Sequence, residues 1–213
     1  MGLGVMFRKF LLARQIEIEK GQIIILGVRS TIATTSMLIS IHEEIIKKLG
    51  YEGIKILYEA GKIGGRELAK SLEDKVGLKG MELINSLATG CSELTGWGII
   101  TPTNCDFSNF TVIFEVENSP LSLSRRSSAF CHLERGLIAG AMEMVFKRRV
   151  DGIETKCRSI GQPNCEFIIK PTEEFDLNSK LVHEQLPIEE IVKTKKKMGL
   201  PIPKKFKKYS LKS

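Results

Sequence analysis

The chain has 213 residues, of which 42% are hydrophobic and 27% are charged, and its formal net charge is +7. This balance is typical of one globular domain or little more, and it excludes collagen, coiled-coil and wholly disordered classes. A chain of this length removes roughly 70% of its unfolded surface from water, so it needs no disulfide or metal ion merely to form a core.

The positive charge is concentrated at the C-terminal end. Nine of the 32 basic residues lie between Lys193 and Ser213, where there is no acidic residue, which leaves 23 basic against 25 acidic residues elsewhere. No run of 18 uncharged apolar residues is present, and Arg8 and Lys9 interrupt the apolar start, so neither a transmembrane segment nor a secretory signal is expected. We therefore expect a cytoplasmic protein with reduced cysteines.

The first half of the chain predicts a β-hairpin followed by three helices. Apolar residues on both sides of Glu19-Lys20-Gly21 predict two strands within residues 16–28. A first helix is expected to begin at the capping residues Thr34–Ser36 and to end before Gly50. Apolar residues at helical spacing predict two more helices, over about 53–75 and 79–94.

The second half predicts strands with one more helix. Strands are expected at 99–100 and 110–116, on either side of a break, and a helix at 130–148. A second hairpin is expected from 153–160 and 165–170. This order indicates an α+β fold, with an antiparallel sheet built from hairpins and packed against a cluster of helices.

Glycines recur inside the predicted helices. Gly61, Gly64 and Gly65 fall within the second helix, and Gly136 and Gly140 lie one turn apart in the helix at 130–148. Each interior glycine costs about 1 kcal/mol relative to alanine. We therefore expect close packing of another backbone, or a kink, at these positions.

The composition changes after Pro171. We expect a domain over residues 1–171 and a C-terminal extension over 172–213. A short helix is compatible with residues 172–192. The lysine-rich segment from residue 193 onward is expected to be mobile, forming a flexible basic tail with few buried contacts.

Three cysteines and a glutamate in the final third suggest a metal site. Cys157 and Cys165 are equally far from Gly161 in the predicted turn, so they should face each other across the hairpin. Cys131 begins the preceding helix, where the helix dipole favours a thiolate. Glu154 can complete a tetrahedral zinc site alongside the three sulfur ligands.

Other interpretations of these residues remain open at this point. Glu154 and Cys157 are separated by an odd number of positions, so a bulge or a strand end must lie between them if both face one site. Each cysteine is also compatible with a small buried apolar residue. A disulfide between Cys157 and Cys165 is a further alternative.

The same region resembles the closing signature of the 4-vinyl reductase domain family. That pattern is a cysteine, a glycine-rich helix, Glu-x-x-Cys and then Gly-x-x-x-Cys-x-Phe, and it is present here from Cys131 to Phe167. Gly64-Gly65, Gly96-Trp97-Gly98 and Asn118-Ser119-Pro120 also look similar. The resemblance therefore covers roughly residues 16–170.

The resemblance implies a small α+β sensor fold, akin to nitric-oxide-signalling and TRAPP trafficking domains and commonly dimeric. Similar proteins bind small hydrophobic molecules between the helices and the sheet, and some hold zinc through three cysteines and a glutamate. Those ligands correspond here to Cys131, Glu154, Cys157 and Cys165. Phenol-sensing relatives have a histidine where this chain has the stretch 91–94, so the resemblance does not extend to phenol recognition.

Two aromatic residues are candidates for a ligand chamber. Trp97 and Tyr58 each combine a large apolar face with one hydrogen-bonding group, which suits binding of a small hydrophobic molecule. Packing in the core is the alternative for both residues.

The sequence favours a non-enzymatic sensor or regulatory domain that binds a small hydrophobic molecule and contains a structural zinc site. One alternative is a reductase-type enzyme that borrows a cofactor, although no nucleotide-binding motif and no acid–base pair is evident. Another is a dimeric adaptor that presents the Lys193–Ser213 tail to nucleic acid or to a protein partner.

Overall fold

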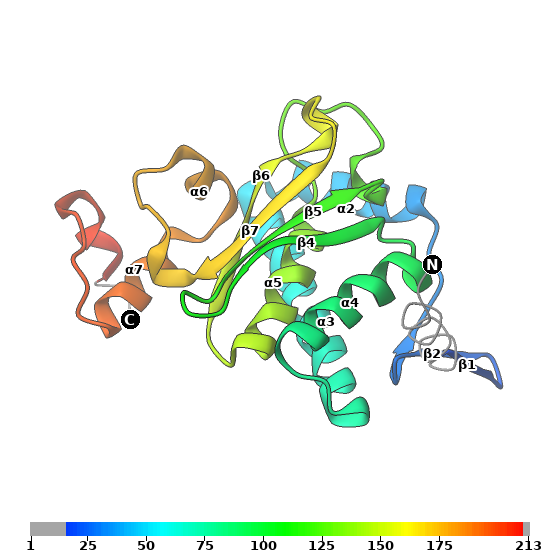
Figure 1. Ribbon diagram of the computed structural model, residues 1–213. Helices are drawn as coiled ribbons and strands as arrows, with labels where there is room; N and C mark the ends of the chain where they lie inside the picture. Colours follow the sequence, from blue (N-terminus) through cyan, green and yellow to red (C-terminus); the bar gives the residue numbers. More distant parts are fainter. Residues whose placement is uncertain (1–15, 211–213) are drawn as a thin grey trace.

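The structure is a computed structural model that describes residues 16–210. An antiparallel four-stranded sheet packs against helices, which confirms the predicted α+β class. Figure 1 shows a small N-terminal sheet and the C-terminal helices on opposite sides of this body. Within the described part of the chain, no helix combines the length and the apolar character needed to cross a membrane.

The N-terminal sheet consists of β1 (Ile16–Glu19), β2 (Gln22–Ile25) and β3 (Val28–Ser30), paired in that order. The predicted hairpin is confirmed, and Lys20 and Gly21 both have positive φ, as in the tight turns that join such strands. Strand β3 was not predicted. It follows a second tight turn, in which Leu26 and Gly27 also have positive φ.

Three helices follow, as predicted: α2 (Thr35–Leu49), α3 (Tyr51–Val76) and α4 (Gly80–Gly90), which continues into the π-helix η1 (Cys91–Thr95). The Thr34 hydroxyl caps α2 by accepting a hydrogen bond from the Met37 N–H. Gly50 ends α2, and its N–H donates to the Ile46 carbonyl.

Helix α5 (His132–Phe146) packs against α3 through glycines. A Cβ atom at Gly61 would lie 2.1 Å from the Leu133 carbonyl oxygen, and one at Gly65 would lie 1.9 Å from the Leu137 carbonyl oxygen. Gly136 and Gly140 meet the backbone of α3 in the same way. Close packing therefore explains these four glycines. It does not explain Gly64, which has open space around it.

The main sheet contains β4 (Ile99–Asp106), β5 (Thr111–Glu117), β6 (Val150–Lys156) and β7 (Cys165–Pro171), in the order β4-β5-β7-β6. The predicted break at 101–108 is wrong, because β4 continues through Pro102 with a shift of register before Asn104. Strand β4 is an outer strand, where a proline removes no essential hydrogen bond. Residues 158–160 form the 3-10 helix η3 instead of continuing a strand.

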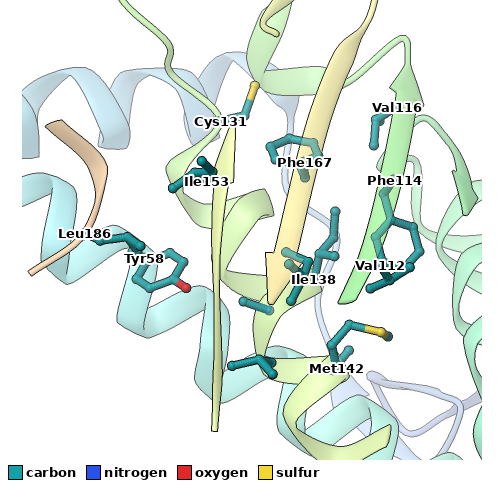
Figure 2. Packing of buried hydrophobic residues seen from close by; sticks show 14 of the residues in the cluster. Tyr58, Val112, Phe114, Val116, Cys131, Ile138, Met142, Ile153, Phe167 and Leu186 are labelled. Atoms are coloured by element: carbon teal, nitrogen blue, oxygen red, sulfur yellow. The ribbon is translucent and has the colours of Figure 1, made fainter. Parts of the chain in front are cut away.

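The core lies between this sheet and the helices. Figure 2 shows Phe114 of β5 and Phe167 of β7 on one side, with Ile138 and Met142 of α5 opposite them. All four side chains are buried. The two central strands and α5 therefore form the rigid framework on which the C-terminal hairpin is built.

The extension is more structured than its composition predicts. It forms η4 (Thr172–Glu174), α6 (Lys180–Gln185), α7 (Ile188–Lys197) and η5 (Lys204–Ser210). Helix α7 buries Ile188, Ile191 and Val192, and Phe206 of η5 is only 5% exposed. The expectation of few buried contacts after residue 193 is therefore wrong for the described residues, because apolar residues between the lysines anchor the segment.

Candidate metal centre

The four predicted ligands come together from three elements of the C-terminal half. Cys131 is the N-cap of α5, Glu154 lies in β6, Cys157 follows the end of β6, and Cys165 is the first residue of β7. Their ligand atoms all lie within 4.8 Å of one another. The three cysteines are fully buried and Glu154 is only 1% exposed.

The spacing between the sulfur atoms suits a tetrahedral metal ion. The Sγ atom of Cys131 lies 3.9 Å from that of Cys157 and 3.7 Å from that of Cys165. Two sulfur ligands at a zinc–sulfur distance of about 2.3 Å in tetrahedral geometry are separated by about 3.8 Å. All five cysteines are free, so the structure does not contain the alternative Cys157–Cys165 disulfide.

A local irregularity allows Glu154 and Cys157 to face the same site. The pairing of β6 with β7 shifts register between Glu154 and Lys156, and β6 ends at Lys156. Both the bulge and the strand end that the odd spacing requires are therefore present.

Neighbouring polar groups hold the ligands. The Cys131 N–H donates to Glu154 Oε2 at 3.3 Å, and the Arg158 N–H lies 3.5 Å from the Cys165 sulfur. The Ser159 hydroxyl lies 2.9 Å from the Cys157 sulfur. Glu154 Oε1 is buried and has no partner among the described residues, so this oxygen remains available to a metal ion.

The electrostatics of the cluster indicate a need for a cation. Hydrogen bonds from the other two thiols, followed by burial, raise the pKa of Cys131 well above its ordinary value. Burial and the Cys157 charge raise the pKa of Glu154 well above its ordinary value as well. Four such groups cannot all be ionised in one buried space unless a positive ion compensates them.

Two neighbouring titratable residues are not part of the cluster. His132 is buried and lies outside the four-residue group, in agreement with the prediction that it is not a ligand. Burial is the main cause that lowers the pKa of His132 to about 3. Glu134 accepts a hydrogen bond of 2.5 Å from Ser119, and burial raises its pKa to about 8.

Sequence reasoning missed the residues that support Glu154 from outside the sheet. Gln185 bonds to both backbone polar groups of Glu154, and the buried Arg135 donates to the Gln185 carbonyl. No local pattern marks Gln185, because it lies in the extension, far from any motif. Arg135 falls within the predicted helix, but nothing in the helical spacing indicates its partner.

The two aromatic candidates for ligand binding lie in different environments. Tyr58 is buried, donates to Asp151 Oδ1 at 2.9 Å and accepts from the Gly152 N–H at 2.9 Å. Trp97 is half-buried and packs against the core between η1 and β4. The structure does not bring the two together at one cavity.

A small apolar cavity of about 20 Å³ lies between α4, α5 and the sheet. Its walls are formed by Ile84, Leu87, Ala88, Cys91, Ile100, Phe114, Leu137, Ile138, Ala141 and Met142. Neither Trp97 nor Tyr58 lines it. A volume of this size is comparable to the space needed for one water molecule, whereas ligand pockets have about 300–1,000 Å³.

Known proteins resemble the chain in sequence and in fold. Uncharacterized protein MJ0150 of Methanocaldococcus jannaschii is 30% identical over 115 residues, which cover 54% of this chain and 63% of that protein. The phenol-responsive sensory domain of the transcription activator PoxR, solved with phenol, has a TM-score of 0.71 at 18% identity over 88% of this chain and all of that one. The PoxR domain therefore shares the fold.

A vinyl-4-reductase family protein of Methanocaldococcus jannaschii has a TM-score of 0.45 at 18% identity, over 66% of this chain and 83% of that one. Residues 112–171 match the family model of the 4-vinyl reductase domain, and this stretch contains all four residues of the metal cluster. The chain therefore belongs, through residues 112–171, to the 4-vinyl reductase domain family.

Proposed function

We propose that this protein is a ligand-responsive 4-vinyl reductase domain in which a zinc ion bound by Cys131, Glu154, Cys157 and Cys165 fixes the C-terminal hairpin. The observation that carries the proposal is the convergence of three buried thiols and one buried carboxylate, with ligand atoms within 4.8 Å of one another. Three soft sulfur ligands favour zinc over magnesium or calcium, which prefer oxygen ligands.

The donor set supports a structural role for the metal. Four protein ligands complete a tetrahedral shell, whereas catalytic zinc sites keep one position open for water or substrate. A zinc ion held here would join the start of α5 to β6 and β7. It would thereby stabilise the hairpin against the body.

Metal analysis of freshly purified protein tests this proposal. We expect one zinc ion per chain in the full-length protein, and loss of that zinc in Cys157→Ser, because removal of one thiolate opens the shell. Cys105→Ser is the matched control, since Cys105 is a free, half-buried cysteine outside the cluster. Protein that contains no metal, with freely titrating thiols, would contradict the proposal.

We propose further that a small hydrophobic molecule binds at the apolar cavity between α4, α5 and the sheet. The apolar lining and the match to the 4-vinyl reductase domain family support this site, and the PoxR domain of the same fold was solved with phenol. Because the cavity measures only about 20 Å³, side chains such as Met142 must move to admit even a single aromatic ring.

Thermal unfolding in the presence of simple aromatic compounds tests the cavity. A compound that binds the native state raises the melting temperature by mass action. We expect this rise in the full-length protein and its absence in Ala88→Leu, in which the added atoms fill the cavity. An equal rise in both proteins would place the binding site elsewhere.

A second candidate function, binding of a nucleic acid, is favoured by the lysines displayed on α7 and η5. Residues 188–210 contain eight lysines and two acidic residues. The apolar residues of this segment are buried, so its lysines are held on a fixed surface. A homodimer, which the family resemblance implies, is a separate proposal that measurement of the molar mass in solution can test.

A further inference from the structure

Strand β6 is an outer strand of the main sheet, yet its free edge is closed at one residue. Gln185, the last residue of α6, accepts from the Glu154 N–H at 2.7 Å through Oε1 and donates to the Glu154 carbonyl at 2.8 Å through Nε2. An antiparallel neighbouring strand makes the same pair of bonds with one residue. The side-chain amide of Gln185 therefore takes the place of a strand at Glu154.

Gln185 is itself held firmly in place. It is 2% exposed, and the two ends of the Arg135 guanidinium donate to the Gln185 carbonyl at 2.9 Å and to the Gly152 carbonyl at 2.6 Å. The Tyr51 hydroxyl donates to the carbonyl of Leu186. Figure 2 shows Leu186 on the side of β6 that faces away from β7. The end of α6 is thus fixed by both α3 and α5.

The position of this contact along β6 matters. Glu154 lies at the point where the pairing of β6 with β7 shifts register. A bulge weakens the control that the sheet exerts on the backbone orientation at that residue. The contact with Gln185 supplies the missing constraint from the outer side, while the Cys131 N–H holds the carboxylate from the inner side.

We propose that Gln185 is a positioning residue for Glu154, and that metal binding at the cluster and docking of the segment 180–210 stabilise each other. This inference rests on the proposed zinc site. Coupling between two sites is reciprocal, so a metal that needs Glu154 correctly oriented must favour the docked extension by the same free energy. Helix α7, with its lysines, begins three residues after Gln185 and belongs to the coupled segment.

Gln185→Ala tests the positioning role, because it removes both bonds to Glu154 while leaving the four ligands unchanged. Residues that orient metal ligands typically contribute about 10- to 100-fold to metal affinity. We expect a loss in this range for zinc, measured by competition with a chromophoric chelator. Gln162→Ala is the matched control, since Gln162 is exposed in the turn between Cys157 and Cys165.

Cobalt(II) provides a readout that a general loss of stability would not move. The visible absorption bands of cobalt report the geometry and identity of its ligands. We expect altered bands in cobalt-loaded Gln185→Ala and unchanged bands in Gln162→Ala. Unchanged zinc affinity and unchanged cobalt bands in Gln185→Ala would overturn the inference.

Hydrogen exchange on the unmodified full chain tests the reciprocal effect and does not depend on the folding of any variant. Removal of zinc should reduce protection in residues 180–197 while protection in β4 and β5 is retained. Equal protection of residues 180–197 with and without zinc would overturn the coupling. If the unmodified chain binds no zinc at all, the proposed metal site itself fails, and this result is distinct from the failure of the coupling.

Discussion

Lys62 is a buried cation, only 3% exposed, in the interface between α3 and α5. Its Nζ lies 2.9 Å from Asp151 Oδ1 and 2.8 Å from Glu143 Oε1, and it donates to the Val150 carbonyl at 3.0 Å. Asp151 also accepts from Tyr58 and Thr172. Tyr58 is therefore engaged in a buried polar network, which explains its burial without a ligand.

Asp151→Asn should destabilise the protein by about 3 kcal/mol at neutral pH, because removal of one partner of a buried ion pair leaves a poorly compensated charge. Urea unfolding measures this difference. Glu184→Gln is the control, since its pair with Lys180 is exposed and should contribute less than about 1 kcal/mol. Equal effects of the two substitutions would contradict the assigned role of Asp151.

The same substitution should show a defined pH dependence. Burial alone would raise the pKa of Asp151, but the Lys62 charge and the hydrogen bonds from Thr172 and Lys62 outweigh it and lower the pKa below its ordinary value of 3.8. A lowered pKa contributes stability above the unfolded value and loses it as the pH falls through the folded value. The difference between the unmodified chain and Asp151→Asn should therefore shrink below about pH 3.8.

At the scale of elements, the packing of α3 on α5 depends on glycines that let two backbones touch. Gly65→Ala would place a Cβ atom 1.9 Å from the Leu137 carbonyl oxygen, so the helices must separate. We expect a loss of several kcal/mol in the free energy of unfolding, at or above the roughly 1–3 kcal/mol that is typical of overpacking.

Gly64→Ala is the matched control in the neighbouring position of the same helix. Nothing lies within 4 Å of a Cβ atom at Gly64, so the substitution should stabilise α3 by roughly 0.5–1 kcal/mol. Thermal unfolding of the two variants should therefore move in opposite directions. Destabilisation by both would mean that the glycines serve helix flexibility and not close packing.

At the scale of the whole molecule, the charge distribution predicts where a polyanion binds. The lysines at 204 and 205 are exposed next to the buried Phe206, which holds η5 on the body. Replacing Lys204 and Lys205 by glutamate should weaken binding of duplex DNA at low salt and reduce the steepness of its salt dependence. Fluorescence anisotropy over a range of salt concentrations measures both quantities.

The same change of net charge on α2 provides the control. Lys47 and Lys48 are exposed and pair only loosely with Glu44. Their replacement by glutamate should leave DNA binding nearly unchanged if the site is the C-terminal segment. Equal weakening by the two double substitutions would mean that binding follows net charge and not a particular surface.

The sequence alone was sufficient for features that neighbouring residues decide. Capping at Thr34 and Gly50 fixed the ends of α2, and the spacing of Cys131, Glu154, Cys157 and Cys165 was enough to predict that they meet. The odd interval between Glu154 and Cys157 even required the bulge that is observed. These signals are local, because caps, turns and hairpin registers depend on residues a few positions apart.

Only the tertiary structure decided the features that depend on distant residues. Tyr58 bonds to Asp151, 93 positions away, and Gln185 bonds to Glu154, 31 positions away. The continuity of β4 through Pro102 depends on its place at the edge of the sheet, and the packing of the lysine-rich extension depends on where Phe206 can be buried. Such contacts follow from how the elements pack, because side-chain type and spacing do not specify a partner far along the chain.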